Sequence, residues 1–426
     1  MNKIESAWQS LFKKFNILEE IKKHGPFLIT SKQINEFKES RVMTKFDHSS
    51  NLPKLFFEND LSVLPITHGS YLIGNFDSYF SVKGIPHKKP AIINFPNNLE
   101  SININNIYSE AAALNCAYVS EMLNDVIGDI CFPTISGRMS TSKFDFIIKN
   151  KLNSEFYNVN VANSQCEIDG GYESDNALMI IEAKNYSIND FLIRQLYYPY
   201  RLWISKVKKP VIPVFLTYSN NIFSFSIYGF EKPDEYNSLV LKEQKNFMFA
   251  PEEITIDEIK NISDGTKIIP ELNIPFPQAD SFERVVDLFS LLLESDLTLD
   301  EIKSNYAFDV RQAAYYISAL QYLGLVEKIN RDGEVYCHLN NTGKRIVSMP
   351  FKQKYLEIAK CILQHEVFNK VLQAYFSKAA PVTKEEAITI MKSCNIYNVD
   401  KESSTVGRRA QTVIRWIEWI LELVNG

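Results

Sequence analysis

The stretch "EIDGGYESDNALMIIEAKN", residues 167–185, joins two strand-like runs and ends in charged residues. Five apolar residues follow one another at 177–181, and a short continuous apolar run is typical of a strand buried on both faces. Glu182 and Lys184 come directly after this run, on either side of Ala183. Buried charges cost free energy unless they have partners. We therefore expect the charged end of this strand to border a cleft.

A tight turn between the two runs predicts which residues face each other. Asp175–Asn176 separates the runs, and Asn and Asp suit tight hairpin turns. If this pair is the centre of the turn, the numbers of opposed residues sum to 351, which places Asp169 opposite Glu182 and Glu167 opposite Lys184. Strand residues two apart share a face, so all four side chains are expected on one face of the hairpin.

Two carboxylates in opposed positions suggest a bound cation. Cross-strand neighbours have Cβ atoms about 5 Å apart, and two carboxylates at that distance repel each other unless a cation lies between them. Mg²⁺ prefers such hard oxygen ligands. Two alternatives stay open at this point. Gly170–Gly171 could introduce a bulge that shifts the register, and the charges could form a salt-bridge ladder that faces solvent.

The composition is that of a globular protein with several domains. The chain has 426 residues, of which 45% are hydrophobic and 23% are charged, and this length suggests roughly two to four domains. No stretch approaches the ~20 apolar residues that span a bilayer, and the amphipathic start of the chain lacks the apolar centre of a signal peptide. We therefore expect a cytoplasmic protein with no membrane contact. The six cysteines include no CxxC pair, which argues against a structural zinc site.

The first two thirds of the chain have the patterns of two domains. Residues 1–50 have helical patterns and residues 54–97 have strand patterns, which predicts an N-terminal α+β domain over residues 1–100. The sequence does not define its role, and contact with DNA is one alternative. The next domain is predicted over residues 101–272 and begins with the alanine-rich helix pattern of residues 109–128. A second helix pattern and five strand patterns follow: 188–206 for the helix, and 142–149, 156–169, 177–184, 211–217 and 222–230 for the strands. This order predicts an α/β domain with a mixed sheet.

The last third of the chain has a different pattern and follows a proline-containing linker, "NIPFPQAD", at residues 273–280. Residues 278–348 contain three helix patterns and then a hairpin centred on "RDG" at 331–333. Three helices followed by a β hairpin predict a winged-helix domain. Residues 349–426 repeat part of this pattern, which predicts a second helical or winged-helix-like unit.

The quoted stretch resembles the PD-(D/E)XK nuclease motif, with Asp169 as the first acid and residues 182–184 as the E-x-K element. The longer string, through "FLIRQLYYPYRLW" to "VFLTYSNNIFSFSIYGF", is similar to type II restriction endonucleases of this fold. Gln195 matches a polar position on the helix that follows the motif, and Glu110 lies where many members supply a further acid. Ile168 stands where the literal motif has proline. The resemblance covers about 100 residues and implies a mixed-sheet α/β nuclease core.

The resemblance also implies a role for each residue of the motif. Mg²⁺ would be held by three carboxylates and one main-chain carbonyl: Glu110, Asp169, Glu182 and Ala183. Such a metal ion lowers the pKa of bound water and neutralises charge on the phosphate. Lys184 would orient that water or stabilise the developing charge, and Gln195 would be a polar support. Arg194 could reach a DNA phosphate, although a solvated charge on the helix face is at least as strong an alternative.

Helices in the C-terminal units are candidates for reading the DNA sequence. Helix-turn-helix proteins read bases with residues near the N-terminus of their third helix, where Arg pairs with guanine and Gln with adenine. The residues at this place are Arg311 and Gln312 in the first unit, and Arg408, Arg409, Gln411 and Thr412 in the second. Residues 344–426 contain 13 Lys and Arg against 8 Asp and Glu, in a chain of net charge −5. This asymmetry favours a nucleic-acid surface, although winged helices can also mediate only protein contacts.

The sequence thus predicts a Mg²⁺-dependent, site-specific endonuclease that acts on double-stranded DNA, as in a restriction-modification system. Cutting both strands requires two active sites, so a homodimer is expected, at least on DNA. Two alternatives remain open. The chain could be a nuclease that acts on modified or branched DNA, or a winged-helix DNA-binding regulator with an inactive nuclease-like domain. The presence of Asp169, Glu182 and Lys184 together favours the enzyme.

Overall fold

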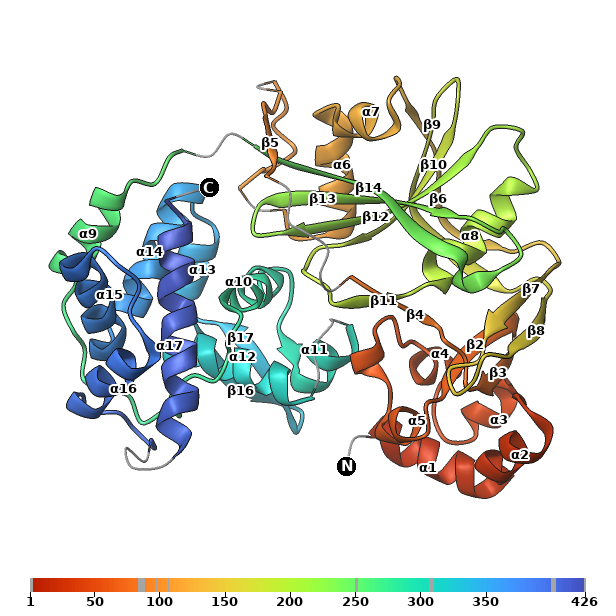
Figure 1. Cartoon of the computed structure of the whole chain (residues 1–426), viewed down its shortest axis with the longest axis horizontal. Coiled ribbons are helices and arrows are strands. Elements are labelled where there is room, and N and C mark those ends of the chain that lie inside the picture. The colour runs from red at the N-terminus through yellow and green to blue at the C-terminus, as the bar shows by residue number, and fades with distance from the viewer. Residues whose placement is uncertain are drawn as a thin grey trace.

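The computed structural model describes most of the chain: residues 3–82, 89–96, 98–105, 107–249, 252–305, 310–399 and 404–424. Within these ranges, the side chains of residues 304, 305, 310, 311 and 404 are not described. We divide the molecule into an N-terminal region (3–82), a central region (89–249) and a C-terminal region (252–424). Figure 1 shows the central sheet at the upper right, the N-terminal region beneath it and most helices of the C-terminal region at the left.

The N-terminal region packs short helices against a small antiparallel sheet. Its helices are α1 (Lys3–Phe15), α2 (Ile17–His24), α3 (Ser31–Asn35), α4 (Ser40–Met43) and α5 (Lys54–Glu58), with a 3₁₀ turn η1 (Ser49–Asn51). The sheet has the order β1-β3-β2, with β1 (Phe27–Thr30), β2 (Ser62–Thr67) and β3 (Ser70–Gly74). Trp8, Phe12 and Phe56 form the centre of the core, with ring centroids 4.8–6.0 Å apart. The predicted mixture of helices and strands is present, but β1 lies within the segment predicted as helical and α5 within the segment predicted as strands.

The central region is built on a seven-stranded sheet with the order β5-β14-β13-β12-β10-β9-β6. The strands are β5 (Ala91–Ile93), β6 (Phe132–Ser140), β9 (Gln165–Glu173), β10 (Leu178–Lys184), β12 (Val211–Ser219), β13 (Ile222–Phe230) and β14 (Leu239–Phe249). Strand β10 is parallel to β12 and β14 is parallel to β5, whereas the other neighbouring pairs are antiparallel. The predicted mixed α/β architecture with a mixed sheet is therefore confirmed.

Helices cover both faces of this sheet, because strand β10 is apolar on both faces. Met179 and Ile181 pack with α6 (Glu110–Val119) and α7 (Met122–Ile127) in one core. Leu178 and Ile180 pack in a second core with α8 (Arg194–Ile204) and the hairpin of β7 (Phe144–Lys149) and β8 (Phe156–Val161). Strand β10 is thus buried at every position, and the only polar residues in it are at its end.

Two tight turns fix the strands around β10. In the first, the main-chain N–H of Ser174 donates to Ala177 O at 2.9 Å, so that Asp175–Asn176 forms a two-residue hairpin turn, as predicted. The paired residues of β9 and β10 run from Glu173↔Leu178 to Gly170↔Ile181, so their numbers sum to 351 and the predicted register is confirmed over this range. In the second turn, Asn220 and Asn221 join β12 to β13 with φ angles of 49° and 63°, as the favoured two-residue hairpin turns require.

The C-terminal region is mostly helical and has a small three-stranded sheet. Its helices are α9 (Ile256–Gly265), α10 (Phe282–Leu291), α11 (Leu299–Asn305), α12 (Val310–Tyr322), α13 (Asn341–Val347), α14 (Phe351–Leu363), α15 (Glu366–Lys378), α16 (Lys384–Ser393) and α17 (Ser404–Glu422). Strands β15 (Leu297–Thr298), β16 (Val326–Arg331) and β17 (Glu334–Leu339) form the sheet, in the order β15-β17-β16. The hairpin of β16 and β17 turns at Asp332–Gly333, as predicted.

The organisation of this region differs from the expected pair of units in two respects. One continuous hydrophobic core runs from Ile254 to Ile420 and includes residues of both units. Helix α9 packs in this core through Ile259, so the expected domain end at residue 272 falls too late. In addition, the part of 349–424 that the structure describes contains helices and no strand. Its resemblance to the first unit is therefore limited to helices.

Two short segments join the N-terminal region to the central region. Strand β4 (Tyr79–Ser81) pairs with β11 (Asp190–Leu192), which follows β10 in the chain.

Among the helices that the structure describes, none has the length and apolar character needed to cross a membrane.

Candidate active site

The ammonium group of Lys184 lies at the centre of the candidate site. Its side chain is 8% exposed, and Nζ donates to Glu182 Oε1 at 2.6 Å and to the main-chain oxygen of Ala183 at 3.0 Å. Nζ also lies 3.4 Å from Glu110 Oε1, at the start of α6. The structure therefore groups Lys184 with three of the four residues expected to hold a metal ion.

Asp169, the fourth residue, reaches the same place because strands β9 and β10 separate. The last pair of residues is Gly170↔Ile181, and Asp169 is the next residue of β9 in the direction away from the turn. Asp169 Oδ2 instead accepts a hydrogen bond from the main-chain N–H of Ala183 at 2.8 Å. The Asp169 carboxylate thus binds a main-chain N–H of β10 that lies beyond the last residue pair, and it lies beside residues 182–184.

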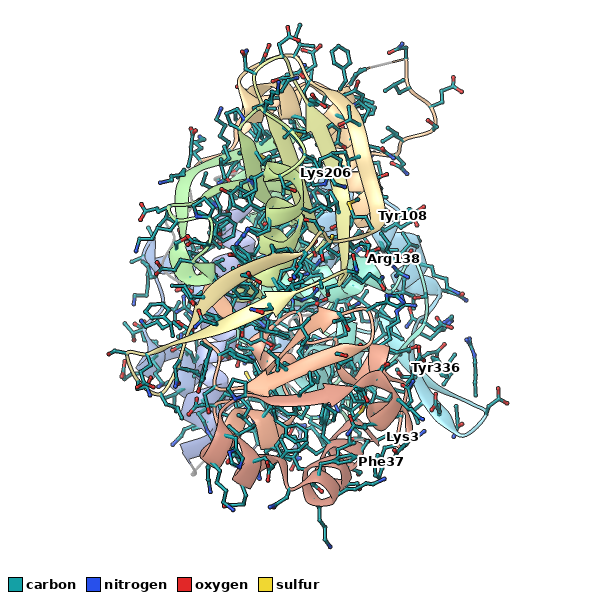
Figure 2. All side chains as sticks on the ribbon, turned by 90° about the vertical axis from the view of Figure 1, so that its right-hand side faces the viewer. Lys3, Phe37, Tyr108, Arg138, Lys206 and Tyr336 are labelled. Carbon is teal, nitrogen blue, oxygen red and sulfur yellow. The ribbon has the colours of Figure 1, made fainter. Side chains whose placement is uncertain are left out.

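The separation of the strands corrects one expectation, which placed Glu167 opposite Lys184. Glu167 lies on the exposed side of β9 and forms an ion pair with Arg138 of β6, with 3.2 Å between Arg138 Nε and Glu167 Oε2. Strand β6 is the edge of the sheet and is exposed along most of its length. In Figure 2, Arg138 lies at mid-height, below Tyr108, which precedes α6. The sheet edge beside Asp169 is therefore open to a partner.

Gln195 supports the site from the first turn of α8. Its Nε2 donates to Glu182 Oε1, the oxygen that also accepts from Lys184. Gln195 Oε1 is buried and has no hydrogen-bond partner among the residues that the structure describes. The amide therefore holds one oxygen of Glu182 and leaves its own oxygen available in a buried place.

Three carboxyl groups share the single ammonium of this site. Burial raises the pKa of Glu110, Asp169 and Glu182, and the charge of Lys184 only partly opposes this effect. Burial alone would lower the pKa of Lys184, but Glu182 and Glu110 outweigh it and hold that pKa well above its ordinary value. The site thus has three carboxyl groups around the one ammonium group of Lys184.

This donor set fits a hard divalent cation in its chemistry, because carboxylate and carbonyl oxygens are the ligands that Mg²⁺ takes. The spacing differs from that of a formed metal centre. Over the described ranges, no three His, Cys, Asp or Glu side chains lie close enough together to hold a metal ion. Lys184 occupies the position between the carboxylates, so metal binding here requires its ammonium to move away from Glu182.

Arg194 has a different environment from the one expected. It is half-buried at the start of α8, and its guanidinium lies 5.7 Å from the centre of the Tyr198 ring. Its Nε is buried without a hydrogen-bond partner among the described residues. Arg194 is therefore no simple solvated charge on the helix face, and part of it serves the packing of α8.

The candidate DNA-reading residues of the C-terminal region lie in unequal environments. In α12, Gln312 is half-buried, and the Arg311 side chain lies outside what the structure describes. In α17, Arg408 is exposed, whereas Arg409 and Gln411 are half-buried. Burial, followed by the charge of Arg408, lowers the pKa of Arg409. Of the four residues of α17 predicted to contact DNA, Arg408 is therefore the exposed one.

Thr412 corrects the expectation that it contacts DNA. Its side chain is 1% exposed, and its hydroxyl donates to Asp280 Oδ1 at 2.7 Å. The hydrogen bond ties α17 to the segment that precedes α10. Thr412 therefore belongs to the interior of the C-terminal region.

The environment of Thr412 predicts a loss of stability without a loss of DNA affinity. In Thr412→Val, the hydroxyl that donates to Asp280 is lost; because Asp280 is exposed and water can replace this donor, the loss should be about 0.5–1.5 kcal/mol of unfolding free energy. Denaturant unfolding measures this loss, and a duplex-binding assay should show an unchanged Kd. The matched variant Arg408→Ala should have the opposite effects, with unchanged stability and weaker duplex binding. A stability of Thr412→Val equal to that of the wild type would contradict the assignment of Thr412 to the interior.

The structure also brings residues to the site that the sequence analysis missed. The segment 45–49 of the N-terminal region lies against β11, the strand that follows the candidate site, where Asp47 O accepts from the main-chain N–H of Leu192 at 2.9 Å. The charge of Asp47 contributes to the raised pKa of Asp169 after the larger effect of burial, and Lys45 acts in the opposite sense on Glu110. The sequence carries no local signal for this contact, because more than 100 residues separate the two segments.

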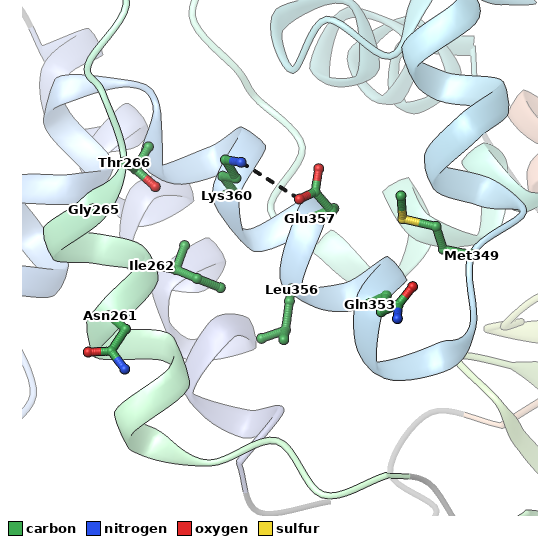
Figure 3. A pocket seen from close by; sticks show the side chains of 9 residues that line it. All are labelled: Asn261, Ile262, Gly265, Thr266, Met349, Gln353, Leu356, Glu357 and Lys360. Carbon is green, nitrogen blue, oxygen red and sulfur yellow. Dashed lines mark ion pairs between the residues drawn. The ribbon is translucent and has the colours of Figure 1, made fainter.

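A groove elsewhere in the molecule is distinct from this site. It lies between α9 and α14 in the C-terminal region and is shown in Figure 3. Ile262 and Leu356 contribute apolar side chains, and Glu357 and Lys360 form an ion pair with a distance of 3.7 Å on one wall. None of the predicted catalytic or DNA-contacting residues lines it.

Comparisons with known proteins divide the chain along similar lines. Three family models match, all described as domains of unknown function: DUF6996 over residues 5–73, DUF6997 over 74–248 and DUF7226 over 284–425. The first two matches correspond roughly to the N-terminal and central regions, and the third covers the C-terminal region from α10 onward and leaves out α9. The searches of curated proteins and of solved structures found no match.

Proposed function

We propose that this chain is a Mg²⁺-dependent, site-specific endonuclease of double-stranded DNA, in the PD-(D/E)XK superfamily and most like a type II restriction enzyme. The observation that carries the proposal is the convergence of five residues where β9 and β10 separate: Glu110, Asp169, Glu182, Lys184 and Gln195. They come from two strands and from helices on both faces of a mixed sheet. This composition suits a site that binds one cation and one phosphate.

Each group then has a defined task. A bound divalent ion lowers the pKa of its water and neutralises charge on the phosphate. The carboxylates of Asp169 and Glu182 would hold this ion, together with Glu110 and the Ala183 carbonyl. Lys184, whose raised pKa keeps it protonated, places a positive charge beside the scissile phosphate. Gln195 keeps Glu182 oriented through its hydrogen bond.

Recognition of the DNA sequence is assigned to the C-terminal region. Helices α10, α11 and α12 followed by the hairpin of β16 and β17 have the order of a winged helix, and α12 is the candidate recognition helix, with Arg311 and Gln312 near its start. Arg408 of α17 adds an exposed positive charge. A homodimer on DNA would supply the two active sites that a double-strand cut needs.

The test of the function is a digestion whose products are sequenced. The purified full chain is incubated with methylated and unmethylated plasmid DNA, with Mg²⁺ or with excess EDTA. We expect fragments with the same ends from every molecule that contains the recognition sequence, and no fragments in EDTA. Intact DNA of both kinds at all Mg²⁺ concentrations would contradict the proposal. Fragments from the methylated plasmid alone would instead favour a nuclease that acts on modified DNA.

A further inference from the structure

The loop that follows Lys184 is held by both flanking regions of the chain. This exit loop, residues 185–189, leads from the end of β10 to β11. Tyr186 is buried, and it packs with Leu291 of α10. The main-chain N–H of Ser187 donates to Asp287 Oδ2, also from α10, at 3.0 Å. The segment next to the candidate catalytic lysine is therefore in direct contact with the C-terminal region.

The N-terminal region holds the same loop from the other side through His48, which is 1% exposed. His48 Nδ1 lies 2.6 Å from the main-chain oxygen of Asp190, and a carbonyl oxygen can only accept, so Nδ1 carries the proton. In the neutral ring, Nε2 then accepts from the Tyr186 hydroxyl at 3.1 Å. Ser49 adds a hydrogen bond from its main-chain N–H to Asp190 Oδ1 at 3.1 Å.

Asp287 connects the exit loop to β12, the strand that runs parallel to β10. Its side chain is 4% exposed, and both of its oxygens accept from the hydroxyl of Ser219, at 2.9 and 3.0 Å. Ser219 is the last residue of β12, which pairs with β10 up to Thr217↔Lys184. One carboxylate of the C-terminal region thus fixes the ends of the two strands on which the position of Lys184 depends.

The chemistry of Asp287 fits this task. Burial raises its pKa to about 6, while the hydrogen bonds from Ser187 and Ser219 oppose the shift. The group is therefore ionised at the mildly alkaline pH of a nuclease assay, when a carboxylate accepts from two donors at once. Arg284, one turn earlier in α10 and also buried, supplies a compensating charge. The two hydrogen-bond donors and the nearby positive charge hold the Asp287 carboxylate in one position.

We propose that Asp287 is a positioning residue, through which the docked C-terminal region holds Lys184 in its working place. The inference rests on the proposed nuclease function and deepens it. The central region is then incomplete without its neighbours, and the region assigned to DNA recognition controls the geometry of the cleavage site. A displacement of the exit loop moves Lys184 relative to the phosphate, and a misplacement of about 1 Å can cost on the order of 10²-fold in rate.

Four full-length proteins test this: the wild type, Asp287→Ala, Asp287→Asn and Tyr355→Phe. The last is the matched control, because the Tyr355 hydroxyl lies in the same contact between the central and C-terminal regions but accepts from Asn221 Nδ2, at 3.0 Å, in the turn between β12 and β13 and not in the exit loop. We expect Asp287→Ala to lower kcat by on the order of 10²-fold with an unchanged KM for DNA. Asp287→Asn, which keeps one acceptor oxygen, should recover part of kcat, and Tyr355→Phe should cut like the wild type.

Hydrogen exchange of the peptide that covers residues 178–192 provides a readout independent of cleavage. We expect faster exchange in Asp287→Ala than in the wild type and no change in Tyr355→Phe. The inference is overturned if Asp287→Ala keeps the wild-type kcat, if Tyr355→Phe loses as much, or if the peptide exchanges equally in all variants. If the wild type itself cuts no DNA, the proposed function fails, whereas the exchange data still decide whether Asp287 holds the loop. If Asp287→Ala does not fold, Asp287→Asn gives the same comparison.

Discussion

The Glu182→Gln variant is expected to bind duplex DNA like the wild type and to cleave it on the order of 10³-fold more slowly. Glutamine keeps the shape of the side chain and an oxygen for the hydrogen bond with Lys184. It loses the negative charge that holds a divalent ion. Loss of this charge also relieves repulsion from Asp169 and Glu110, which contributes to the raised pKa of Glu182. The fold should therefore tolerate the change. Single-turnover cleavage in Mg²⁺ and duplex binding in Ca²⁺ measure the two effects.

Asp169→Asn should behave in the same way, and Glu167→Gln is the matched control. Glu167 lies two residues before Asp169 on β9, but it is exposed and pairs with Arg138 instead of Lys184. Its replacement should leave the cleavage rate unchanged. If Glu182→Gln or Asp169→Asn cut at the wild-type rate, the assignment of this site would be wrong. Equal losses in Glu167→Gln would indicate a general disturbance of the sheet edge.

Lys184→Ala is expected to show the second large effect, a slower chemical step at saturating Mg²⁺, on the order of 10²- to 10³-fold. The variant also removes the positive charge that stabilises the carboxylates of Glu110, Asp169 and Glu182. Removal of one partner from a buried ion pair is destabilising. A divalent ion can replace that charge. The melting temperature of Lys184→Ala should therefore be lower than that of the wild type without metal, and it should rise more on addition of Mg²⁺.

A second substitution, Lys184→Arg, separates the effect of the positive charge on stability from the effect of the lysine on the chemical step. Lys184→Arg keeps the positive charge, so it should restore the melting temperature, but its planar fork cannot make the same contacts as a point charge and cleavage should stay slow. Thermal melts with and without Mg²⁺, with single-turnover rates, separate the two roles. A Lys184→Ala enzyme that cleaves at the wild-type rate in saturating Mg²⁺ would show that Lys184 organises the site and takes no part in the reaction.

Local sequence patterns predicted the sheet at the site well, up to the point where the two strands separate. The turn at Asp175–Asn176 and the register as far as Gly170↔Ile181 depend on neighbouring residues alone. The separation beyond Gly170 depends on a third strand, because β6 pairs with β9 through two register shifts around Ile135. Gly170–Gly171 indicated a possible bulge, and the shift from Ile135↔Gly171 to Gly137↔Ile168 lies there, but residues 167–185 alone do not reveal the pairing with β6. The close approach of Asp169 to Ala183 was therefore not predictable from the hairpin.

The candidate residues in α17 show the limit of reasoning by analogy. Thr412 was assigned to DNA because the segment resembles the first C-terminal unit, whereas the apolar spacing of α17 itself places the residue beside Val413 and Trp416 in the core. The contacts of His48 and Asp287 with the exit loop had no sequence signal at all. These contacts join parts of the chain that are 138 and 100 residues apart, and they form only when all three regions dock.

The measurement that tests the central claim most directly is the binding of Mn²⁺ to the full chain, followed by the electron paramagnetic resonance signal of the free ion. It compares the wild type with the Asp169→Asn/Glu182→Gln double variant, each in the presence of a short DNA duplex, and it does not require the recognition sequence to be known. The account predicts that the wild type removes Mn²⁺ from solution, and that the double variant, with an unchanged melting temperature, does not. Equal Mn²⁺ binding by the two proteins, or none by the wild type, would contradict it.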